Sequence, residues 1–219
     1  MSELSRRDAL LIALAFAAGA VDAVAFLGLD VLTAVMTGNL VLLGVAIGRG
    51  AVRSAVRSLV ALGGYAIGVV AGSRMTPMVR GAVWSADITR ALAIEWALQA
   101  MFFVGWLLSG GAPDGVAAAA LILISGLAMG LQAAAIRTLG PGTSTTYVTG
   151  TLTTLLGELS AVGGFGPDTR RRALTVAALV AGAIAGALVL VTVAPLAPAV
   201  PLVVIGGVVV IARRSFPSA

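Results

Sequence analysis

The stretch AAGAVDAVAFLGLDVLTAVMTGNLVLLGVAIG, residues 17–48, decides the fold, because it joins a long apolar segment to a shorter one through polar residues. The first apolar segment runs from Ala9 to Leu29 and follows the short basic leader MSELSRRD. A signal peptide has a shorter apolar core than this and precedes a less apolar chain. We therefore predict a first membrane-spanning helix whose N-terminus lies in the cytoplasm.

The composition extends this reading to the whole chain. Of its 219 residues, 59% are hydrophobic and 11% charged, and the mean hydropathy is +1.08, whereas soluble domains are about one-quarter charged. Further apolar segments follow at about 31–48, 58–73, 91–109, 115–136, 142–160, 173–194 and 198–212. Several are close to the ~20 residues that cross a bilayer. We predict an all-α polytopic membrane protein of the bacterial inner membrane, in contact with the lipid bilayer.

Several residue types are missing, which excludes whole classes of chemistry. The chain has no Cys and no His, and because it has no Lys, all 14 basic residues are Arg. Thiolate and His-based catalysis, zinc and haem sites, and a phosphate-binding lysine are therefore excluded. The arginines flank apolar segments, a pattern typical of cytoplasmic membrane loops rather than of nucleic-acid binding. We expect no cofactor, no bound metal and no nucleic-acid partner.

The second half of the sequence resembles the first. MTGNLVLL (36–43) and VTGTLTTL (148–155) align at an offset of 112 positions. Gly64, Gly68 and Gly72 fall on Ala178, Gly182 and Gly186 at nearly the same offset. Such stripes of small residues let membrane helices approach closely, within one chain or between two copies in a homo-oligomer. This pattern predicts two repeats, residues 1–112 and 113–219.

The direction of the repeats depends on the number of spans. Eight spans would make the repeats parallel and place ten arginines inside and four outside. If 31–48 and 142–160 are broken or re-entrant segments, six spans remain, the repeats are inverted, and the division becomes eleven to three. The positive-inside rule does not separate these alternatives. The Ser- and Thr-rich stretch GTSTTYVTGTLTTLLGELS (142–160) is a poor lipid-facing span, which favours six spans with two re-entrant segments.

A polar triplet lies at the same place in each repeat. In broken membrane helices, Gly tolerates the backbone break and Thr or Asn can cap the half-helix. Paired half-helices at the membrane midplane are a common way for transporters to bind a solute. The alternative is that these residues serve tight packing. The candidate substrate contacts are Thr37, Gly38, Asn39, Thr149, Gly150 and Thr151.

Carboxylates within apolar segments are the second kind of candidate. Asp22 lies deepest by position and is the best candidate for a proton- or cation-coupling group, with a purely structural hydrogen-bonding role as the alternative. Glu158 is a second coupling candidate, although Glu158 and Glu95 are both expected near solvated segment ends. Gln132 lies where the repeat places the counterpart of the Asp22 region, so it joins the candidate substrate contacts.

Two blocks of the sequence resemble the YoaK family of multi-pass bacterial membrane proteins. They contain Val-Asp-Ala (21–23), Met-Thr-Gly-Asn (36–39), Gly-Leu-Gln (130–132) and Thr-Tyr-Val-Thr-Gly-Thr (146–151). The resemblance covers essentially the whole chain and implies about six spans, but it implies no substrate, reaction or catalytic residue. One departure is Ala133, where the resemblance leads us to expect Asn.

Three classes of function remain open. The leading hypothesis is a small-molecule permease or channel, not an enzyme, whose site at the repeat interface takes a small polar or anionic solute. An intramembrane enzyme acting on a lipid would need acid-base or Mg²⁺ chemistry from the carboxylates, and no paired-acid motif supports it. A structural or partner-binding membrane protein would keep the triplets dry and closed.

Overall fold

The computed structural model describes residues 3–77, 84–140, 148–160 and 166–216, and these ranges are helical with no strand. One turn of 3-10 helix, η1 (Ala194–Leu196), precedes the last helix. The α-helices are α1 (Glu3–Leu29), α2 (Met36–Gly48), α3 (Val52–Met75), α4 (Ala86–Leu108), α5 (Gly115–Arg137), α6 (Val148–Ser160), α7 (Pro167–Thr192) and α8 (Ala199–Ser215).

Six helical segments of the described chain are long and apolar enough to cross a membrane, namely α1, α3, α4, α5, α7 and the segment Ala194–Ser215 that η1 and α8 form together. The other two, α2 and α6, have 13 residues each. At ~1.5 Å per residue they reach only about 20 Å, short of the ~30 Å hydrocarbon core. The prediction of six spans and two short segments is confirmed. The described residues within 31–48 and 142–160 form only the short helices α2 and α6, which does not support the eight-span alternative.

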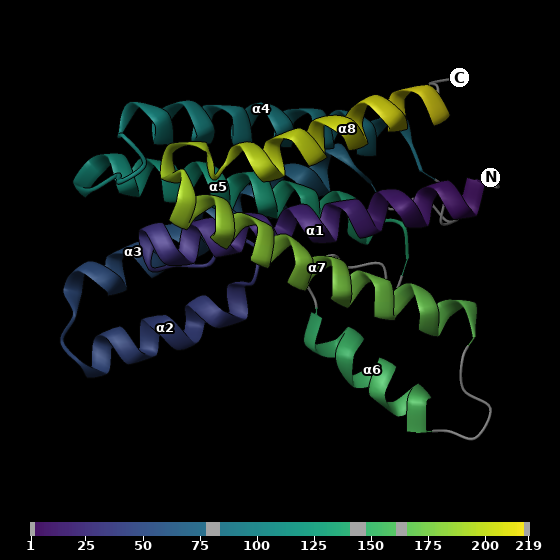
Figure 1. The fold of residues 1–219 in the computed structure, drawn as a ribbon, viewed down its shortest axis with the longest axis horizontal. Helices are drawn as coiled ribbons and strands as arrows, with labels where there is room; N and C mark the ends of the chain where they lie inside the picture. The colour runs from purple at the N-terminus through teal and green to yellow at the C-terminus, as the bar shows by residue number, and fades with distance from the viewer. Residues whose placement is uncertain (1–2, 78–83, 141–147, 161–165, 217–219) are drawn as a thin grey trace.

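The long helices run nearly parallel or antiparallel to one another, and both chain ends lie at the same end of the bundle (Figure 1). Trp84, just before α4, stacks on Phe216, just after α8, with ring centroids 5.5 Å apart. At the opposite end, Trp106 of α4 donates a hydrogen bond of 2.8 Å to the carbonyl of Ala194. We call these the terminal end and the distal end of the bundle.

The glycine stripes hold helix pairs together within this one chain. On α3, a Cβ added at Gly64 would lie 2.6 Å from the carbonyl oxygen of Leu123 on α5, and one at Gly68 would collide with the carbonyl of Leu127. On α7, a Cβ at Gly182 would collide with the carbonyl of Phe16 on α1. The stripes therefore serve folding, and the homo-oligomer that they suggested is not what these glycines pack against.

The two glycine-mediated pairs use corresponding positions. Gly68 and Gly182 are 114 positions apart in the sequence, and their contacts Leu127 and Phe16 are 111 apart. Gly72 contacts Leu131, and Gly186 contacts Ala20. The two glycines are again 114 positions apart, and the residues that they contact are again 111 apart. The remaining helix contacts match in the same way: α2 packs on α3 as α6 packs on α7, and α4 packs on α5 as α8 packs on α1.

A cluster of charged residues ties the distal end together. The guanidinium of Arg57 on α3 donates 3.0 Å to Asp30, which follows α1, and 3.2 Å to the carbonyl of Leu29. It also reaches Asp114, the N-cap of α5, at 3.4 Å. The exposed Arg53 pairs with the same aspartate. Since Arg57 is only 11% exposed, it links the start of α3 to the end of α1 and the start of α5.

Candidate functional site

The chain turns back into the molecule after α1 and is held there by Asp22. The carboxyl oxygens of Asp22 accept three consecutive backbone N–H bonds, from Thr33 and Ala34 at 2.7 Å and from Val35 at 3.0 Å. Asp22 lies almost two turns before the end of α1, so the loop at 30–35 rises beside α1 before α2 starts. A buried carboxyl group thus satisfies three backbone donors that would be costly to bury alone.

Asn39 fixes the same loop from the other side. Its side-chain oxygen accepts the N–H of Leu32 at 3.0 Å, and its amide nitrogen donates to the carbonyl of Leu32. Asn39 is fully buried. Gly38 lies against the side chain of Leu32, where a Cβ would collide with it. Thr37, by contrast, is exposed on the opposite face of α2. Of the first triplet, Asn39 and Gly38 therefore hold the loop, and only Thr37 faces outward.

The loop is also tied to the second half of the chain. The hydroxyl of Ser125 on α5 donates 2.9 Å to the hydroxyl of Thr33, and both residues are fully buried. Ala34 packs in a small cluster with Ala18 and Val21 of α1 and Met129 of α5. The entry to α2 is thus built between α1 and α5, at the centre of the bundle.

The second triplet lies at the start of α6. Gly150 and Thr151 are half-buried, and the carbonyl of Gly150 accepts 2.9 Å from Thr154. The side chain of Thr149 lies outside the described residues. At the far end of the helix, Glu158 accepts a bond of 2.9 Å from Thr169 and pairs with Arg172, both on α7. Glu158 therefore ties the end of α6 to the start of α7.

Among the described residues, the two short helices pack mainly on different partners. α2 packs on α3, and α6 packs on α7. Along the length of the bundle, both short helices begin near the middle and run toward opposite ends, α2 to the distal end and α6 to the terminal end (Figure 1). The N-terminus of a helix carries a partial positive charge of about half an elementary charge. The N-cap residue of α2, Val35, supplies no side-chain cap.

Several buried polar side chains lie on the facing sides of α4 and α5. Gln99 on α4 lies 3.7 Å from the sulfur of Met129 on α5. Glu95 lies one turn before Gln99 on α4. Gln132 lies about one turn after Met129 on α5, which runs antiparallel to α4, so Glu95 and Gln132 lie at neighbouring depths along the bundle. Glu95, Gln99 and Gln132 are at most 3% exposed. Sequence reasoning placed Glu95 at a solvated segment end, which is wrong because α4 begins at Ala86.

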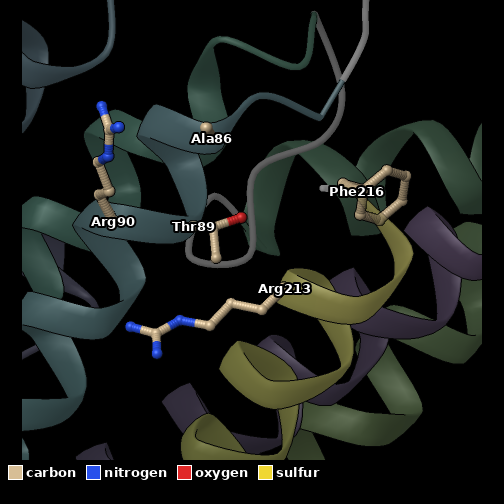
Figure 2. Close-up of a pocket in the computed structure, with 5 residues that line it drawn as sticks. All are labelled: Ala86, Thr89, Arg90, Arg213 and Phe216. Carbon is tan, nitrogen blue, oxygen red and sulfur yellow. The ribbon is translucent and has the colours of Figure 1, made fainter. Parts of the chain in front are cut away.

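A polar pocket of about 280 Å³ opens at the terminal end, between the first turns of α4 and the last turn of α8. Arg213 extends from α8 toward α4, which contributes Thr89 and Arg90 (Figure 2). Phe216 closes one side. Arg90 is paired with Asp87 at 3.0 Å. This pocket lies far from both triplets along the bundle, so it does not belong to the candidate solute site.

Among the described residues, no group of three or more acidic side chains could together hold a metal ion. The polar groups in the interior of the bundle include backbone N–H groups, hydroxyls and side-chain amides, which are suited to hydrogen bonding with a small polar solute.

Residues 10–211 match a family described as "Protein of unknown function (DUF1275)". The chain belongs to this family. A relative, the UPF0700 transmembrane protein YoaK of Bacillus subtilis (strain 168), is 36% identical over 162 residues, which cover 73% of this chain and 70% of the relative. No solved structure matches the chain. These comparisons confirm the resemblance to YoaK.

Membership of the DUF1275 family identifies a multi-pass membrane protein and leaves its activity open. The relative is named as a transmembrane protein, in agreement with the six apolar helices. Neither name specifies a substrate, a reaction or a binding residue. A function must therefore be inferred from the geometry of the two short helices.

Proposed function

We propose that the chain is a permease or channel for a small polar or anionic solute, and not an enzyme. The observation that supports this most directly is that α2 and α6 begin near mid-depth and run to opposite ends of the bundle (Figure 1). Two half-helices in this arrangement bring two positive N-terminal ends to the membrane interior, where transporters bind their solutes. Thr37 and Thr149, each the second residue of its helix, are the proposed solute contacts together with Gly150 and Thr151.

The proposal includes an inverted repeat, with residues 1–112 related to 113–219. The matched glycine contacts at offsets of 111 and 114 support it. The offset of 111 that relates α1 to α5 places Ala133 opposite Asp22, and the offset of 112 places Thr151 opposite Asn39. The first half thus has an acid, Asp22, at the entry to its short helix, whereas the corresponding position in the second half is an alanine and Glu158 lies near the far end of α6. The positive end of α6 is therefore the better binding end for an anion.

The arrangement of arginines supports an orientation. Arg49, Arg53 and Arg57 lie at the distal end, around the start of α3, and the remaining described arginines lie toward the terminal end. Positive residues are enriched in cytoplasmic loops. We therefore place both termini in the cytoplasm of a bacterium, with the chain in its inner membrane.

The natural lack of cysteine makes a direct test possible. Thr37→Cys and Thr149→Cys, each in otherwise unchanged protein in liposomes, are exposed to a membrane-impermeant thiol reagent from either side. We expect both to react, because a water-filled path reaches the start of each short helix. Ile184→Cys is the matched control, since Ile184 lies mid-helix on the exposed apolar face of α7 and should be shielded by lipid.

Function is then measured in the same liposomes as swelling in glycerol or sodium formate, a neutral and an anionic probe. Thiol modification at Thr37→Cys should slow swelling, and the same treatment of Ile184→Cys should not. Failure of both threonine positions to react from either side, in folded protein, would contradict the proposal and favour a structural role. Asn39→Leu is unsuitable for this purpose, because Asn39 holds the loop at Leu32.

A further inference from the structure

A groove runs along the outer surface of the bundle between α1 and α8. Its volume is about 430 Å³, and its lining is apolar apart from residues at one end. Val203 and Ile211 on α8 are 72% and 50% exposed. Gly207 forms part of the floor, and a Cβ added there would meet no atom within 4 Å. The groove is therefore open along its side, and nothing within the described chain fills it.

The length of the groove suits one lipid chain. Its lining on α8 extends from Val203 to Ser215, which is about 18 Å at ~1.5 Å per residue. One leaflet of the hydrocarbon core is about 15 Å thick, half of the ~30 Å bilayer interior. The groove is lined by α1 and α8, which both run along the bundle and reach its terminal end (Figure 1), so the groove follows the direction of the spanning helices. An extended acyl chain in one leaflet would therefore lie along it.

The polar end of the groove is positively charged. Arg6 on α1 lines it directly. Arg214 lies seven residues after Gly207 and three after Ile211, and both spacings place it on the groove face of α8. Arg6 and Arg214 are exposed. Asp8, the acid closest to Arg6 in sequence, is taken up by Arg7 and Arg171 at 3.5 and 3.6 Å. Among the described side chains no ion pair involves Arg6 or Arg214, so both guanidiniums face the membrane surface without an acidic partner from the described part of the chain.

We propose that this groove binds an anionic phospholipid, with one acyl chain along α1 and α8 and the phosphate between Arg6 and Arg214. Basic pockets beside membrane helices on the cytoplasmic side bind anionic head groups. A guanidinium fits a phosphate group in a bidentate manner. A second copy of the chain would bring the same arginines to the contact and would not neutralise them. The charge at the end of the groove therefore favours the lipid over a dimer.

The test compares lipids that differ in the head group alone. Purified protein in a neutral detergent is titrated with phosphatidylglycerol or with phosphatidylcholine of the same acyl chains. Thermal unfolding and native mass spectrometry report stabilisation and retained lipid. We expect saturable stabilisation and retention with phosphatidylglycerol only, and roughly tenfold or more weaker binding in the Arg6→Gln/Arg214→Gln double variant. Equal effects of both lipids would overturn the proposal.

Two further variants separate the parts of the site. Arg213→Gln removes the same charge from the same turn of α8, but Arg213 points toward α4 (Figure 2), so the preference for phosphatidylglycerol should persist. Gly207→Phe fills the groove in open space without changing charge, and retention should fall. Full binding by Gly207→Phe, or equal stabilisation by inorganic phosphate, would overturn the acyl-chain placement. A dimer that Gly207→Phe disrupts would show instead that a second copy occupies the groove.

Discussion

Asp22 shows how a charged residue inside a membrane helix can serve the backbone. Three consecutive N–H groups converge on its two carboxyl oxygens, and the loop that they belong to carries the chain into α2. The sequence predicts that Asp22 faces either a cavity or a hydrogen-bonding partner, and hydrogen bonding to backbone is one of the two roles considered above. The partner itself was not predictable, because the loop at 30–35 has no sequence motif that marks it as returning toward α1.

At this scale we predict that Asp22→Asn destabilises the protein by about 1–3 kcal/mol. An asparagine has one acceptor oxygen, and its amide group would turn a donor toward at least one backbone N–H. The free energy of unfolding, from denaturant or thermal unfolding in detergent, provides the measurement. Asp87→Asn is the control, since Asp87 makes an exposed pair with Arg90 and should change stability by less than about 0.5 kcal/mol. Equal effects of the two variants would contradict the role assigned to Asp22.

Among the elements, the long apolar helices were predictable and their ends were not. The apolar segments gave every span, since hydrophobicity decides which residues enter a bilayer. The apolar segments 58–73 and 91–109 begin later than the helices α3 and α4 that contain them. The first turns of these helices are polar, with Arg53, Arg57, Asp87 and Arg90. Those polar residues belong to helices that extend past the apolar core. The misplaced start of α4 also explains why Glu95 was expected at a solvated end and is buried.

The glycine stripe of α3 leads to a prediction about the packing of helices. Gly68→Ala should destabilise the protein by about 1–3 kcal/mol, because the new methyl group would collide with the carbonyl of Leu127 and push α3 away from α5. Gly63→Ala, on the same helix with no atom within 4 Å of the added Cβ, should be neutral or stabilising by up to about 1 kcal/mol. Thermal unfolding midpoints of the two variants distinguish them. Equal midpoints would contradict the close packing of α3 on α5.

For the whole molecule, the short helices decide the topology. If residues 31–48 crossed the membrane, the connection before α3 would return to the side of the N-terminus. Because α2 only reaches from mid-depth to the distal end, the same connection stays on the opposite side (Figure 1). The charge count alone did not separate these arrangements. The shortness of α2 did, since its 13 residues cannot cross the hydrocarbon core.

This topology is tested with single cysteines in the natural cysteine-free chain. Ala51→Cys lies in the connection between α2 and α3, and Ser215→Cys lies at the end of α8. In intact cells, an impermeant thiol reagent should label Ala51→Cys and should reach Ser215→Cys only after the cells are opened. Labelling of both from the same side would restore the eight-span arrangement. The reverse pattern would keep six spans but place the termini outside, which would also move Arg6 and Arg214 to the outer leaflet.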